Sequence, residues 1–171
     1  MHVSLVITIL GADRPGLVNL ISEVIEEHQG SWSESRMAHL AGKFAGILQI
    51  SIPEDNIKSL STALEKLQTK ELRILLETAQ ASQKPAPTKT LNIEVLCQDR
   101  LGIINDVTEA LSKLNVNIEE LDSTVKEASM SGGMLFSAEL TLGLPEGIGA
   151  NDVEDSLGKL SDQLMIDINL S

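Results

Sequence analysis

The spacing of hydrophobic residues along the first half of the chain predicts alternating strands and helices. Residues 3–10 (VSLVITIL) form a nearly continuous, β-branched apolar run, which is typical of a strand that is central in a sheet or buried on both faces. Residues 15–28 then carry apolar side chains at helical spacing and indicate an amphipathic helix. The apolar positions of this helix are Leu17, Val18, Ile21, Val24 and Ile25.

The following segments complete one structural unit. Residues 32–40 and 44–52 have strand-like patterns and are separated by residues 41–43 (AGK), which predicts a hairpin with a short turn. Residues 55–67 show a second helical pattern, and residues 72–77 form a closing apolar strand. The predicted order of elements is therefore β-α-β-β-α-β.

The same order recurs in the second half of the chain. After a shift of 86 residues (89 − 3), residues 3–35 overlay residues 89–121. The identities fall at turn positions and at positions that set the phase of the helix, which a chance similarity of two apolar runs would not favour. The identical pairs are Asp13 and Asp99, Arg14 and Arg100, Gly16 and Gly102, Asn19 and Asn105, Glu23 and Glu109, and Glu34 and Glu120.

The offset between the copies then increases. Residues 44–52 align with residues 134–142, so that Phe44 matches Met134. The extra residues of the second copy lie near 129–133 and 144–150, both rich in glycine and serine, and predict longer loops. The second helix also recurs, since Leu60, Leu64 and Leu67 match Val153, Leu157 and Leu160. The last strand recurs at residues 164–170, which alternate apolar with polar side chains.

These patterns predict an α+β protein of two domains, residues 1–78 and 89–171. Residues 79–88 contain two prolines and no apolar period, and are expected to form a linker. With right-handed crossovers, β-α-β-β-α-β gives the ferredoxin-like fold, a four-stranded antiparallel sheet with both helices on one face. Each copy leaves an edge strand open, which favours pairing of copies edge to edge or face to face, within one chain or in a homodimer.

Composition restricts the class of partner. The chain has 25 acidic and 13 basic residues and a net charge of −12, which argues against binding to nucleic acid or to an anionic membrane surface. A basic protein partner is compatible with this charge. Cys97 is the single cysteine, so no internal disulfide or thiolate metal cluster is expected. We expect a cytoplasmic location, because neither a signal-peptide pattern nor a membrane-length apolar run occurs.

The loop between the first strand and the first helix carries the most chemistry. Asp13 is suited to cap the helix by accepting N–H hydrogen bonds, and Pro15 suits the first helical turn. Gly16 would allow a second backbone or a ligand to approach closely. The remaining N–H groups and the helix dipole favour a carboxylate, such as that of a small amino acid. Helix capping alone would also explain this loop, without any ligand.

The segment LGADRPGLV, followed by an amphipathic helix, resembles the ACT domain, a regulatory module that typically binds amino acids. The resemblance covers nearly the whole chain, as two copies. Residues 34–36 (ESR) and 43–46 (KFAG) further resemble the glycine cleavage system transcriptional repressor family, which consists of tandem ACT domains without a DNA-binding domain. This resemblance implies repression through contact with a DNA-bound activator, with glycine relieving that contact.

The resemblance also implies a ligand-binding loop in each copy, between paired domains and near the start of the first helix. Leu101 replaces Pro15 in the second copy, so we expect the first loop to bind if only one does. The implied ligand-binding residues are Ala12, Asp13, Arg14, Pro15, Gly16, Leu17 and Asn19 in the first copy, and Gln98, Asp99, Arg100, Leu101, Gly102, Ile103 and Asn105 in the second.

Other candidate residues favour no further site. The three histidines lack metal spacing, Cys97 is expected to be a small buried apolar residue, and no nucleophile accompanies Asp13 and Asp99. Trp32 and Phe44 are expected in the core, with a partner surface as the alternative. We therefore expect no metal, no cofactor and no catalysis.

Three hypotheses follow. The first is an amino-acid sensor that regulates transcription through a protein partner, with glycine as the first ligand to test. The second is an interaction module that is indifferent to amino acids. The third is a regulatory subunit of an enzyme of amino-acid metabolism.

Overall fold

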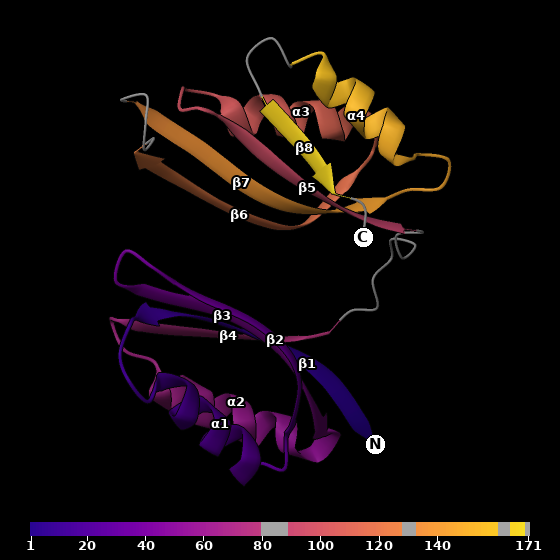
Figure 1. The fold of residues 1–171 in the computed structure, drawn as a ribbon. Helices are drawn as coiled ribbons and strands as arrows, with labels where there is room; N and C mark the ends of the chain where they lie inside the picture. Colours follow the sequence, from indigo (N-terminus) through magenta and orange to yellow (C-terminus); the bar gives the residue numbers. More distant parts are fainter. Residues whose placement is uncertain (80–88, 128–132, 161–164, 170–171) are drawn as a thin grey trace. The chain divides into compact units, whose positions relative to one another are not determined.

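A computed structural model describes residues 1–79, 89–127, 133–160 and 165–169 of the chain. The chain divides into two compact units, Met1–Gln83 and Lys84–Ser171. In each unit, four strands form one antiparallel sheet and two helices cover one of its faces (Figure 1). The α+β class and the repeated β-α-β-β-α-β order predicted from the sequence are confirmed.

The helices and strands lie close to their predicted positions. Residues 54–56 form a separate 3-10 turn, η1, before the second helix begins. The first unit contains β1 (His2–Ala12), α1 (Leu17–Glu27), β2 (Ser31–Leu40), β3 (Lys43–Pro53), α2 (Ile57–Leu67) and β4 (Leu72–Thr78). The second contains β5 (Lys89–Gln98), α3 (Ile103–Lys113), β6 (Asn117–Glu127), β7 (Met134–Leu144), α4 (Ala150–Gly158) and β8 (Met165–Asn169).

The strand orders β2-β3-β1-β4 and β6-β7-β5-β8 are those of the ferredoxin-like fold. Strand β1 is central, as its apolar run predicts, because it pairs with both β3 and β4. Only one of its faces lies under the helices. Leu5, Ile7 and Ile9 on that face are buried, whereas Leu10 on the other face is 46% exposed.

The cores of the two units are built at matching positions. In the first unit, inward-facing side chains of β1 and β3 pack with the apolar faces of α1 and α2; in the second, those of β5 and β7 pack with α3 and α4. Trp32 and Phe44 are half-buried and pack against the first core, as expected. Among the described residues, the members of each core cluster all come from one unit.

The strand registers correct the alignment of the two copies. Val3 pairs with Ile52, and its counterpart Lys89 pairs with Leu144. The offset between β3 and β7 is therefore 92 (144 − 52), so Phe44 corresponds to Phe136; the predicted match of Phe44 with Met134 is wrong. A slip of two residues keeps every side chain on its own face, so alternation alone could not reveal it.

Most of the extra residues of the second copy lie in the β6–β7 hairpin, and one more lies between β7 and α4, where the offset rises from 92 to 93 (153 − 60). The β2–β3 turn consists of Ala41 and Gly42, whereas β6 and β7 extend the ladder by one further pair, Glu127 with Met134. Residues 128–132 of this connection lie outside the described residues. The predicted linker is also outside them apart from Ala79, whose N–H donates to the Ser4 carbonyl at 2.9 Å.

Candidate functional site

The first loop joins the buried end of β1 to the N-terminus of α1. Its Ala12 N–H donates to the Glu71 carbonyl at 3.1 Å, and its Asp13 N–H donates to the Gly42 carbonyl at 3.1 Å. These two bonds tie the loop to the start of β4 and to the β2–β3 turn. The loop backbone is thus held from both sides by residues distant in sequence.

The predicted cap of α1 is wrong. Helix α1 begins at Leu17, and Gly16 is its N-cap, in the left-handed conformation with φ 85°. Asp13 and Pro15 lie too early in the chain to act as cap and first-turn residue, because the left-handed turn at Gly16 delays the helix. No side chain caps this helix in the described structure, and its first turn carries no acidic residue. The N-terminal N–H groups of α1 thus remain uncapped by side chains.

Two glycines of this loop have different roles. A Cβ added at Gly16 would have nothing within 4 Å, so this residue is needed for its positive φ and not for a close approach. The close approach occurs at Gly11, where a Cβ would lie 3.1 Å from the Glu71 carbonyl oxygen. Within the described residues the close approach of a second backbone occurs at Gly11 and not at Gly16, and the approach of a ligand to Gly16 stays a prediction.

The second loop repeats this backbone but differs in its side chains. Gly102 caps α3 with φ 87°, and the Asp99 N–H donates to the Met134 carbonyl at 2.8 Å, matching the bond from Asp13 to Gly42. Arg100 forms an ion pair of 2.8 Å with Asp106 in the first turn of α3. Leu101, in place of Pro15, is 96% exposed. A carboxylate of the protein itself therefore already lies at the N-terminus of α3.

The two asparagines lie on exposed helix surface beyond the loops. Asn19 Nδ2 donates to Glu23 Oε1 at 2.8 Å, so its side chain points along α1 toward the next turn. In the second unit Glu109 instead forms an ion pair of 2.8 Å with Lys113. The structure thus places residues 13–16 and 99–102 in the two loops, with Ala12 and Gln98 at the strand ends. Leu17 and Ile103 begin the helices and are buried, and Asn19 is engaged outside the first loop.

Cys97 ends the buried face of β5 beside the second loop. Its side chain belongs to the core, and burial raises the pKa of the Cys97 thiol, with the Arg100 guanidinium acting in the opposite direction. Within the described residues, no group of three His, Cys, Asp or Glu side chains is arranged to hold a metal ion. His28 Nδ1 lies 2.8 Å from the Val24 carbonyl, as a satisfied half-buried imidazole.

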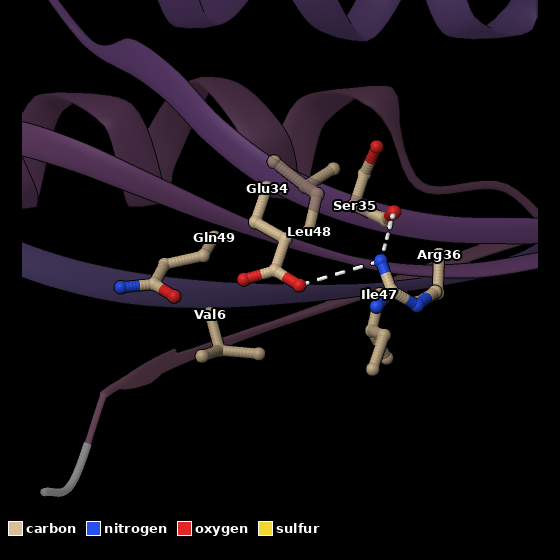
Figure 2. A pocket seen from close by; sticks show the side chains of 7 residues that line it. All are labelled: Val6, Glu34, Ser35, Arg36, Ile47, Leu48 and Gln49. Atoms are coloured by element: carbon tan, nitrogen blue, oxygen red, sulfur yellow. Dashed lines mark hydrogen bonds and ion pairs between the residues drawn. The ribbon is translucent and has the colours of Figure 1, made fainter. Parts of the chain in front are cut away.

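A cavity of about 230 Å³ lies on the sheet face of the first unit that the helices do not cover (Figure 2). Arg36 Nη1 lies 3.3 Å from Glu34 Oε1, and also donates to the Ser35 carbonyl at 3.4 Å. The lining residues are Val6, Glu34, Ser35, Arg36, Ile47, Leu48 and Gln49. The sequence interpretation missed this surface, although Ile47 breaks the apolar alternation of its strand.

We name the uncovered face of the first sheet the open face of unit 1, and its counterpart the open face of unit 2. The strand registers place Arg36, Ile47, Thr8 and Leu75 in one row across the open face of unit 1. The corresponding row of unit 2 consists of Asp122, Glu139, Glu94 and Asp167. The row of unit 1 thus contains two apolar residues, Ile47 and Leu75, at positions where the row of unit 2 has acidic residues.

No helix within the described ranges combines the length and the apolar character that a membrane crossing requires.

Comparison with known proteins identifies relatives of both units together. The glycine cleavage system transcriptional repressor of Escherichia coli (strain K12) is 28% identical over 162 residues, covering 94% of this chain and 85% of the relative. The crystal structure of an unknown protein from Galdieria sulphuraria superposes with a TM-score of 0.89 at 27% identity, covering 100% of this chain and 99% of that chain.

A further solved structure, provisionally described as a glycine cleavage system transcriptional repressor, has a TM-score of 0.70 at 19% identity. It covers 100% of this chain and 99% of its own, and at this identity it supports the fold alone. The ACT-domain family matches residues 4–78 and, independently, residues 92–141. Together with the repeated β-α-β-β-α-β order, these two matches show that the chain is a tandem ACT-domain protein.

Proposed function

We propose that this ACT-domain regulatory protein senses a small amino acid through its first loop and passes the signal to a protein partner. The observation that carries the proposal is the N-terminus of α1, where Gly16 leaves the first-turn N–H groups without a side-chain cap or an acidic neighbour. Ala12, Asp13, Arg14 and Pro15 directly precede this end of the helix, and Leu17 is its first residue.

The chemistry of the loop suits a zwitterion. The uncapped N–H groups and the positive end of the helix dipole favour the α-carboxylate of a ligand. The exposed carboxylate of Asp13 is available to attract the α-ammonium group. Neither group provides a nucleophile with a neighbouring base, so the proposed role is binding without catalysis.

The second loop is proposed as the weaker site. Asp106 already places a negative charge in the first turn of α3, whereas the corresponding residue of α1 is Leu20. A ligand carboxylate at Gly102 would meet this charge and would have to compete with the ion pair between Arg100 and Asp106. We therefore expect one dominant site in each chain.

For the regulated process we propose repression of the glycine cleavage system through a DNA-bound activator, with glycine as ligand. The 28% identity to the Escherichia coli repressor over 94% of this chain supports this choice. The net charge of −12 supports action on a protein instead of on DNA. Such a role corresponds to a cytoplasmic protein.

Isothermal calorimetry of the full chain against the twenty common amino acids tests the sensing role. Glycine or another small amino acid is expected to bind, and Gly16→Ala is expected to weaken binding at least tenfold, since it disturbs the loop backbone. Gly147→Ala is the matched control, because Gly147 also has a positive φ (84°) and free space around an added Cβ.

Two results would contradict the proposal. If no amino acid binds, the sensing role is wrong; if Gly16→Ala and Gly147→Ala bind equally well, the ligand lies elsewhere. Capture of a transcription activator that amino acids release would support the proposed repression. A stable complex that ignores amino acids would instead identify an interaction module.

A further inference from the structure

The open face of unit 1 exposes an apolar surface that its own helices leave uncovered. Ile47, on the inner strand β3, is 51% exposed, and Leu75, on the edge strand β4, is 55% exposed. Val6 and Leu10 lie on the same face of the central strand β1. Clustered exposed apolar side chains at the centre of a sheet mark an interaction surface more often than isolated ones.

Charged residues border this apolar centre in an ordered way. On the edge strand β4, Arg73 and Glu77 lie on either side of Leu75 and point to the open face, since the alternate residues Leu72 and Ile74 are buried and Leu76 is half-buried. On the opposite edge, Glu34 and Arg36 form their own ion pair. Lys43, at the hairpin end of β3, lies on the same face, so the face carries three positive and two negative charges, whereas the whole chain has a net charge of −12.

We infer that the open face of unit 1 binds the same face of a second copy of this chain. A two-fold axis running along the row of Ile47, Thr8 and Leu75 would place each of these residues against its own counterpart. The same axis exchanges the rows on either side of it. Arg73 of one copy then faces Glu77 of the other, twice per dimer, and Leu10 faces Val6.

This arrangement pairs opposite charges at β4, because Arg73 of each copy faces Glu77 of the other. Two sheets that stack face to face bury alternate side chains between them, and here the buried centre is apolar while the opposite charges meet at the rim. Arg36 of one copy faces Arg36 of the other. Glu34 of the same copy balances this charge, because Glu34 Oε1 lies 3.3 Å from Arg36 Nη1. The centre therefore requires no unpaired charge to be buried.

The open face of unit 2 cannot form the same contact. Its corresponding row carries Asp122, Glu139 and Glu94, and a two-fold axis would place each carboxylate against a like charge. Self-association is thus restricted to one face per chain. A single isologous contact closes after two copies, so a dimer is expected and not a longer assembly.

Sedimentation velocity of the full chain across a wide range of concentration tests this inference. The wild-type chain is expected to be dimeric at the highest concentrations, and Ile47→Glu, which introduces the residue found at the matching position of unit 2, is expected to raise the dimer Kd at least tenfold. Val18→Glu is the control, because Val18 is 40% exposed but lies in α1, on the helix side of the same unit. Circular dichroism confirms that both variants fold.

Charge reversal tests the geometry of the contact. Arg73→Glu and Glu77→Arg should each weaken the dimer, since each places like charges together, and the double variant should restore it. A monomeric wild-type chain at every concentration, or a dimer insensitive to Ile47→Glu, would overturn the inference. So would weakening by both single reversals without restoration in the double variant, because the two residues would then not face each other.

Discussion

The open faces of the two units use the same backbone positions for opposite chemistry. The strand registers establish which residues correspond. Thr8 corresponds to Glu94, Ile47 to Glu139, and Leu75 to Asp167. The faces under the helices instead keep apolar residues at nearly every matching position. Both copies thus place apolar residues where a core must be buried, whereas the residues of the uncovered faces differ in charge and polarity.

The two loops diverge in a similar way. Gly16 and Gly102 adopt nearly the same φ, 85° and 87°, and the residue three positions before each donates its N–H to the neighbouring hairpin. The difference lies in charge, because Asp106 pairs with Arg100 only in the second unit. Duplication has therefore preserved the backbone of the loop while making its electrostatic environment unequal.

The largest expected effect tests whether the two cores are equivalent. Leu48 and Leu140 occupy matching positions of β3 and β7 and are 1% and 2% exposed. Replacement of either by alanine should lower the free energy of unfolding of its own unit by about 2–5 kcal/mol. Hydrogen exchange of each unit measures this loss. A loss that spreads equally to the amides of both units would contradict separate cores.

The glycine at each helix start provides the second test. Gly16→Ala and Gly102→Ala should each cost about 1 kcal/mol, since alanine resists the left-handed conformation. Chemical denaturation measures both values. Equal costs would show that the loops share one backbone requirement, whereas a cost at only one glycine would show that the second loop can relax into another conformation.

The acidic row of unit 2 provides the third test. Glu139 lies directly opposite Glu94 and next to Asp122 across the strands, and like charges in such positions repel. Glu139→Gln should therefore raise the free energy of unfolding by about 0.5 kcal/mol at low salt, and the gain should shrink as salt screens the repulsion. Glu146→Gln, in the connection between β7 and α4, is the control. An equal gain in both variants would indicate a general effect of net charge.

The smallest expected effect concerns Cys97, whose counterpart in the first unit is Gly11. Burial raises the pKa of the folded Cys97 thiol, so the folded state prefers the protonated thiol. This contribution to stability is complete below the unfolded pKa and is lost as pH rises through the folded pKa. Alkylation of Cys97 should accordingly be slow in the folded chain. Reaction as fast as that of the unfolded chain would contradict the burial.

Local patterns in the sequence were sufficient for the order of elements and for the repeat. Apolar runs and helical spacing predicted each strand and helix to within a few residues, because both depend on contacts close along the chain. The start of α1 was the exception. The pattern D-R-P-G offered Asp13 as a plausible cap, and only the backbone at Gly16 shows that the helix begins two residues after Pro15.

What the sequence by itself determined is therefore a duplicated β-α-β-β-α-β fold with a repeated, glycine-containing loop in each copy. The tertiary structure decided the two-residue correction between β3 and β7, the hydrogen bonds that hold each loop to its hairpin, and the contrast between the open faces. These features depend on pairing between strands far apart in the chain. Alternation specifies which face a side chain occupies, but only the register specifies its neighbours across that face.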